Sequence, residues 1–129
     1  VASVAIADGF LPDTISTDLH IHHLGHSPPH TLPQTMSKLR ATGMEPADIF
    51  AAVTSRPAAI VQGAEVLGAL QPGAAADLVA LQTSAEPVTF SDAGGNQREG
   101  IEWLPVCTIR QGQIACLSDA ANVEKQPAG

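Results

Sequence analysis

One short stretch of the sequence holds a carboxylate together with every histidine of the chain. Asp18 precedes His20, and the remaining histidines follow closely: His22, His23, His26 and His30. Carboxylate and imidazole groups are ligands for divalent metals, and both can accept or deliver a proton during catalysis. The stretch could therefore bind a metal ion or perform acid–base chemistry, and Asp18 and His20 are its first candidates.

Each of these residues also has a purely structural interpretation. An aspartate after a strand commonly accepts hydrogen bonds from the backbone N–H groups of the following turn. Exposed histidines often do no more than solvate a loop, and the spacing here matches no closed structural zinc motif. For the histidines beyond His20 this interpretation is favoured over a loop that binds zinc or nickel by itself.

The segment that carries Asp18 has the composition of a short strand. Residues 14–17 read Thr-Ile-Ser-Thr and follow Pro12, and the loop over residues 19–30 contains one glycine and two prolines. β-Branched residues favour a strand, whereas the loop can be neither helix nor strand throughout. In α/β barrels, a strand that ends in a carboxylate and opens into a polar loop places that group in the active site.

Helices are predicted on both sides of this segment. Residues 1–7 have the pattern of the last turns of a helix that Gly9 ends, as expected for a piece of a larger protein. Thr31 and Gln34 form a capping-box pattern, so a second helix should begin there and end before Gly43.

A third helix should begin at Pro46 and break before Pro57, because proline disfavours the helical conformation of the residue before it. Its buried residues are expected to be Ile49, Phe50 and Val53. A short helical piece should follow over residues 57–62. Methionines 36 and 44 are interpreted as core filler.

The second half of the chain is predicted to be rich in short strands. Gly68 to Gly73 ends in a Pro-Gly pair that suits a type II turn. Strands are expected at residues 76–81, 87–91, 106–111 and 113–117, with a turn at 92–96 and a hairpin about Gly112. Asp77 is expected to fix a turn in this region.

Composition excludes several classes of protein. The chain has 129 residues, 44% of them hydrophobic and 3% aromatic, so it should fold around an aliphatic core. A net charge of −7 with six scattered basic residues argues against nucleic-acid binding. No apolar run approaches the roughly 20 residues that span a bilayer. Cys107 and Cys116 are expected to be half-buried strand residues, which suits the reducing cytoplasm.

Two phrases resemble enzymes of the amidohydrolase superfamily. Gly68-x-Leu70-x-Pro72-Gly73-x-x-Ala76-Asp77-Leu78-Val79 is similar to the segment by which many of them return from a barrel to a small β-sandwich. The run from Gly9 to His20, followed by residues 31–38 and Gly43-Met44, is similar to the amidohydrolase/deacetylase, dihydroorotase-like branch. Residues 104–112 fit the same branch.

The resemblance implies an α/β fold, namely the C-terminal end of a (β/α)8 TIM-type barrel plus a small β-sandwich module. It divides the chain into the end of the barrel with strand 8, the histidine loop and helices (residues 1–63), the sandwich module (64–117) and a polar tail (118–129). Barrel strands that carry other parts of the site are not in this sequence.

The resemblance also implies a function. In that family the aspartate that ends strand 8 binds the metal centre and shuttles a proton, and Asp18 matches that position. His20 could orient Asp18 or touch the substrate. The cofactor would be divalent metal, most often two zinc ions, and the reaction hydrolysis of amide, cyclic amide or acetyl bonds in a small-molecule substrate. The full-length enzyme would be a homo-oligomer, and these residues alone would be inactive.

Two alternatives remain open at this point. Asp18-x-His20-x-His22 also resembles the motif that begins such barrels, but the interval from His23 to Leu67 is too short for the seven strands that would have to follow. The chain could instead be a non-catalytic homologue or assembly module, or a protein that binds metal through its histidine loop.

Overall fold

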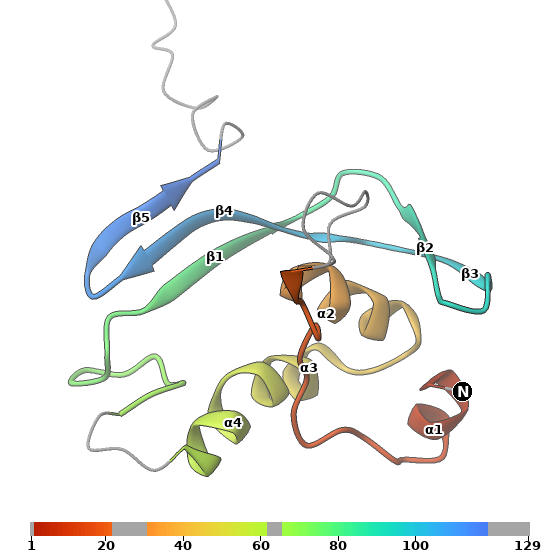
Figure 1. The fold of residues 1–129 in the computed structure, drawn as a ribbon, viewed down its shortest axis with the longest axis horizontal. Helices are drawn as coiled ribbons and strands as arrows, with labels where there is room; N and C mark the ends of the chain where they lie inside the picture. The colour runs from red at the N-terminus through yellow and green to blue at the C-terminus, as the bar shows by residue number, and fades with distance from the viewer. Residues whose placement is uncertain (1, 22–30, 62–65, 119–129) are drawn as a thin grey trace, which may run out of the picture.

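The computed structural model describes residues 2–21, 31–61 and 66–118 (Figure 1). Helices occupy the first half of the chain and strands the second. The described helices are α1 (Ala2–Ala7), α2 (Leu32–Ala41), α3 (Pro46–Val53) and α4 (Ser55–Ile60). The described strands are β1 (Leu78–Thr83), β2 (Val88–Ser91), β3 (Gln97–Gly100), β4 (Trp103–Arg110) and β5 (Gln113–Leu117). None of the described helices is long and apolar enough to cross a membrane.

The ends of the first two helices follow the sequence signals. Thr31 precedes α2, and its hydroxyl accepts a hydrogen bond from the backbone N–H of Gln34 at 3.3 Å. Gly43, with φ of +100°, follows the end of α2, and Gly9, with φ of +79°, follows α1. Glycine takes this left-handed conformation without steric cost, so both helix ends were predictable.

Two details of α3 and α4 differ from the predictions. Phe50 was expected to be buried, but 40% of it is exposed. Helix α4 begins at Ser55, two residues before Pro57. The residue before a proline can remain helical at a helix start because the first turn needs no N–H donor from the proline. Ile49 lies in the core as predicted.

The strands form two antiparallel sheets. One has the order β1-β4-β5, and the other pairs β2 with β3. The hairpin about Gly112 and the turn at residues 92–96 are confirmed. Strand β3 was not predicted because Gln97-Arg98-Glu99-Gly100 has no apolar alternation, and it forms by pairing with β2.

The described strands form two small sheets, and the β-sandwich module stays a prediction. In Figure 1 the helices lie beneath the strands, and α2 packs against β4 and β3. The strand expected at residues 14–17 is absent, and that segment has no regular secondary structure. A strand exists by pairing with neighbours, and no described strand lies next to this segment.

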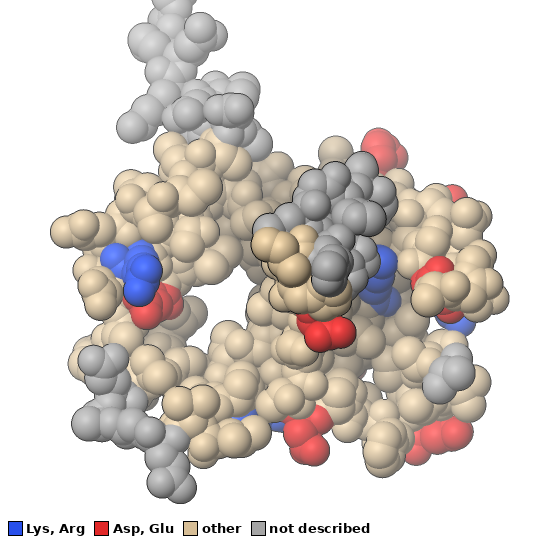
Figure 2. Space-filling model, viewed as in Figure 1, with Lys and Arg blue, Asp and Glu red and all other residues tan. Residues whose placement is uncertain are grey.

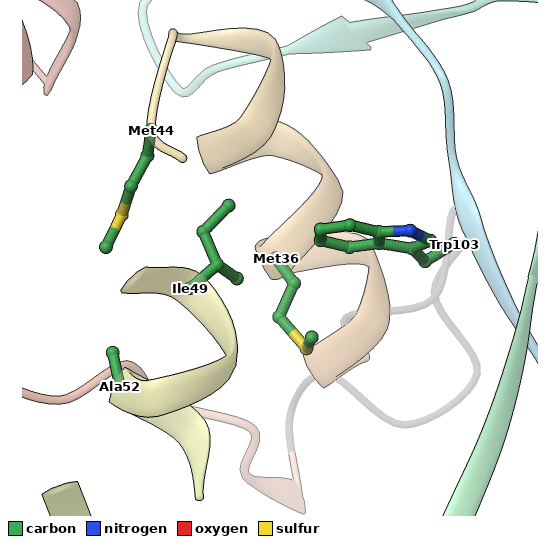
Figure 3. Packing of buried hydrophobic residues seen from close by; sticks show 5 residues of the cluster. All are labelled: Met36, Met44, Ile49, Ala52 and Trp103. Carbon is green, nitrogen blue, oxygen red and sulfur yellow. The ribbon is translucent and has the colours of Figure 1, made fainter. Parts of the chain in front are cut away.

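Trp103 joins the helices to the sheet. It packs in the core with Met36, Met44, Ile49 and Ala52, and Figure 3 shows Ile49 reaching from α3 toward α2. The two methionines therefore fill the core, as predicted.

A buried hydroxyl completes this junction. The Trp103 backbone N–H donates to Ser37 Oγ at 2.8 Å, and Ser37 Oγ donates to the Pro33 carbonyl at 2.7 Å. Ser37 is fully buried, so these bonds satisfy polar groups that would otherwise be costly inside the protein.

The core is small for the length of the chain. Six described hydrophobic residues are buried, while fifteen large ones are exposed on α1, α3, α4 and the strands as well as in the loops. Figure 2 shows a mostly uncharged surface, with an opening between the sheet and the helices. Chains of this length usually bury more than half of the surface that unfolding exposes. With fifteen large hydrophobic side chains exposed, much of the apolar surface of this chain is not covered by its described residues.

Gly68 is expected to tolerate no side chain. Its φ is +67°, and a Cβ there would lie 2.5 Å from the backbone oxygen of Thr54. Gly68→Ala should lower the free energy of unfolding by about 1–3 kcal/mol, from backbone strain plus the clash. Urea unfolding of the protein followed by circular dichroism measures this loss.

Gly73→Ala is the matched control. Gly73 also has a positive φ, +88°, but a Cβ there would meet no atom within 4 Å. Its loss should therefore be smaller than that of Gly68→Ala, because it contains the strain and not the clash. Equal losses would show that the contact with Thr54 is unimportant.

Candidate functional site

Two hydrogen bonds hold the segment that leads to Asp18 against the helices. The Ile15 backbone N–H donates to the carbonyl of Ala52 on α3 at 3.0 Å. Arg56 on α4 donates from Nη1 to the carbonyl of Pro12 at 3.4 Å. The segment is thus attached to α3 and α4 rather than to a sheet, and Asp18 lies beyond both attachments.

Asp18 has an unusual backbone conformation. Its φ is +51°, and its side chain is exposed. Few residues with a Cβ adopt this region, although aspartate and asparagine do so more often than others. Sparsely populated backbone conformations cluster at active sites and ligand-binding loops.

The structural interpretation of Asp18 is not supported by its contacts. In the described part of the chain its carboxylate takes part in no hydrogen bond or ion pair. Thr17 instead serves the local turn, because its Oγ1 accepts from the Leu19 backbone N–H at 3.1 Å. The Asp18 carboxylate is therefore available to a ligand.

The other metal-ligand candidates are only partly placed. His20 is exposed and lies two residues after Asp18. His22, His23, His26 and His30 lie outside the described residues. No three His, Cys, Asp or Glu side chains among residues 2–21, 31–61 and 66–118 come together as a metal site. The Asp18 carboxylate can supply one oxygen ligand to a metal ion, and the described residues complete no metal site around it.

One hollow in the described part of the chain is not lined by Asp18. It has a volume of about 600 Å³ and lies between α1, α2 and the β2–β3 hairpin, with Lys38, Leu39, Phe90 and Arg98 on its walls. At its rim Asp92 accepts hydrogen bonds from Asn96 and Gly94, and the Asn96 side chain is the main reason that the pKa of Asp92 is lowered. These bonds explain Asp92 as a turn residue.

Asp77 has a structural role, as the sequence predicted. Its Oδ1 accepts a hydrogen bond at 2.7 Å from the backbone N–H of Gln111, whose φ is +50°. The bond therefore holds the β4–β5 turn against the start of β1.

Cys107 and Cys116 are both free thiols, the first half-buried as predicted and the second exposed. Cys107 pairs with Leu117, and Cys116 pairs with Thr108. Adjacent residues of a strand point to opposite faces, so the two thiols face away from each other. They are not placed to form a disulfide.

Sequence reasoning missed Arg56. Besides contacting Pro12, its Nη2 forms an ion pair with Asp48 Oδ1 on α3 at 2.6 Å. The contact with Pro12 spans 44 positions of the sequence, so no local pattern indicated it.

This chain is similar to known proteins over nearly its whole length, and not only around Asp18. The model of the amidohydrolase family matches residues 2–124. A deacetylase of Enterococcus faecalis is 36% identical over 115 residues, which cover 88% of this chain and 31% of that protein. A deacetylase of Agrobacterium fabrum is 35% identical over 96 residues, which cover 74% of this chain and 23% of that protein.

Solved structures give the same picture. The crystal structure of an adenine deaminase matches with a TM-score of 0.75 and 33% identity, over 88% of this chain and 31% of that one. A dihydroorotase matches with a TM-score of 0.74 and 29% identity, over 91% of this chain and 31% of that one. The chain thus spans less than a third of the proteins it matches. By the family match over residues 2–124, it belongs to the amidohydrolase family.

Proposed function

We propose that this chain is the C-terminal part of a metal-dependent hydrolase that cleaves non-peptide C–N or acetyl bonds, and that deacetylation is its reaction. The deacetylase relatives favour that reaction over deamination or ring opening. Asp18 is the residue we assign to catalysis, as a metal ligand and proton carrier. His20 is assigned to touching the substrate or, in the complete metal-bound protein, to orienting Asp18.

The observation that carries this proposal is the state of Asp18. Its carboxylate is exposed, has no protein partner among the described residues, and belongs to a residue with φ of +51°. It follows directly on a segment that is anchored at Pro12 and Ile15. An exposed carboxylate without a protein partner, on an anchored segment, is suited to bind a metal ion whose other ligands come from outside this chain.

In the proposed mechanism the chain contributes one acid–base group. When bound, two divalent ions, of which zinc is the first choice, would supply a strong nucleophile at neutral pH and polarise the substrate carbonyl. Asp18 would accept the proton released during attack and deliver it to the leaving nitrogen. The anchored backbone would keep the Asp18 carboxylate close enough both to accept the proton from the attacking nucleophile and to deliver it to the leaving nitrogen.

Apolar exposure supports the view that further protein completes this chain. Phe10, Leu19 and Ile21 flank Asp18 in sequence and are all exposed. We propose that they pack against barrel segments outside this sequence, where residues 14–17 become the last barrel strand. We also propose that the complete protein forms a homo-oligomer and is located in the cytoplasm. Within this chain, we place the boundary between the barrel end and the strand module near residue 63.

Expression of the complete reading frame that encodes this chain tests the proposal. The purified protein should hydrolyse N-acetyl compounds or acetyl esters. Activity on cyclic amides or adenine alone would support the metal-dependent hydrolase and overturn deacetylation as its reaction. A chelator should remove the activity and zinc should restore it. A complete protein without such activity would point to a non-catalytic homologue. Tight metal binding lost on substitution of His22 and His26 would point to a histidine-loop metal protein.

Deletion of residues 21–29 is expected to alter substrate choice. The loop follows the proposed catalytic aspartate, and loops after barrel strands form the mouth of the active site. The ratio of kcat/KM between two N-acetyl substrates of different size should change by about tenfold, equivalent to about 1.4 kcal/mol. An unchanged ratio would remove the loop from the substrate-binding surface.

A further inference from the structure

Arg56 connects three parts of the chain at one point. From α4 it donates Nη2 to Asp48 Oδ1 on α3 at 2.6 Å and Nη1 to the Pro12 carbonyl at 3.4 Å. The guanidinium group is planar and holds its donors in a fixed arrangement. The hydrogen bond from Nη2 to Asp48 therefore also fixes the direction in which Nη1 points toward the Pro12 carbonyl.

A second attachment follows three residues later. The Ile15 N–H bonds to the Ala52 carbonyl at 3.0 Å, so residues 12–15 are tied to the helices at both ends. Only Ser16 and Thr17 separate this attachment from Asp18. A shift of residues 12–15 along α3 would therefore move the Asp18 carboxylate with it.

We propose that Arg56 is a positioning residue for Asp18. Through Pro12 it sets where residues 12–15 lie on α3, and hence where the carboxylate enters the active site. This inference rests on the proposed function, because it matters only if Asp18 reacts. Reactions that depend on alignment lose rate steeply when a group moves by about 1 Å.

The ion pair is unsuited to a mainly stabilising role. The side chains of Arg56 and Asp48 are 37% and 33% exposed. Exposed ion pairs contribute little to stability because water screens them and two long side chains must be ordered. Loss of the Arg56 contacts should therefore change geometry more than folding.

Arg56→Gln in the complete protein tests the proposal. The change should lower kcat by about tenfold or more with KM within about twofold. The Tm should shift by less than about 4 °C. The visible spectrum of the cobalt-substituted protein should change because the Asp18 ligand is displaced, while metal content stays at the wild-type level.

Two further variants make the result specific. Arg56→Lys keeps a charge for Asp48 without the fixed two-donor geometry, so its kcat should lie between those of Arg56→Gln and the wild type. Arg98→Gln makes the same change on β3, an element that takes part in neither Arg56 contact. Arg98 is exposed, and its loss should leave kcat unchanged.

The outcomes separate this inference from the proposed function. If Asp18→Asn is inactive but Arg56→Gln keeps wild-type kcat and cobalt spectrum, the positioning role is wrong and the function stands. A large fall in Tm that accompanies the loss of kcat would show a structural role instead. If Asp18→Asn is fully active, the proposed function itself fails.

Discussion

Asp18→Asn in the complete protein is expected to abolish turnover, with kcat reduced by a factor of about 10³ or more while metal is largely retained. Asparagine keeps the size of the side chain and tolerates positive φ, so the backbone at φ of +51° should persist. What is lost is the carboxylate that accepts and returns the proton. Steady-state kinetics and metal analysis on the same samples measure both quantities.

Asp13→Asn is the matched control for that experiment. Asp13 is an exposed carboxylate of the same segment, between the anchored residues Pro12 and Ile15. It should retain wild-type kcat. Near-normal activity of Asp18→Asn, or equal losses in the two variants, would contradict the role assigned to Asp18.

The second large effect is on stability. Trp103→Ala should lower the free energy of unfolding by about 3–5 kcal/mol, as for other large aromatic residues removed from a core. Trp103 is 7% exposed, its ring centroid lies 5.0 Å from that of Phe50, and Arg40 Cζ lies 4.9 Å from it. Removing the ring would leave a cavity between α2 and β4. Urea unfolding followed by circular dichroism gives the loss.

Leu104→Ala separates burial from position on the strand. Leu104 is the next residue of β4 and is 37% exposed, so its truncation should cost less than about 1 kcal/mol. A loss for Trp103→Ala no larger than that of Leu104→Ala would mean that Trp103 does not hold the helices to the sheet.

Local signals in the sequence predicted local structure well. The Thr31 cap and the glycines after α1 and α2 each depend on residues close by, and the structure has them. Asp77 does hold a turn as expected, but its partner Gln111 lies 34 positions away and was not predicted. Phe50 was misjudged because helical spacing does not say which side of a helix the rest of the fold covers.

Features that depend on distant partners were not predictable in the same way. Strand β3 forms because β2 pairs with it, and its own residues are polar. Residues 14–17 favour a strand by composition but have no described neighbour to pair with. Asp18 was identified through resemblance, whereas Arg56 needed the structure, because its partner Pro12 is far away in sequence.

The most direct test of the account is a crystal structure of the complete, zinc-loaded protein with anomalous scattering recorded at the zinc edge. We expect an anomalous peak about 2.0–2.2 Å from a carboxylate oxygen of Asp18, the usual zinc–carboxylate distance. The remaining ligands should come from residues upstream of this chain. A zinc centre that is complete without Asp18, or a reading frame with no barrel ahead of it, would contradict the account.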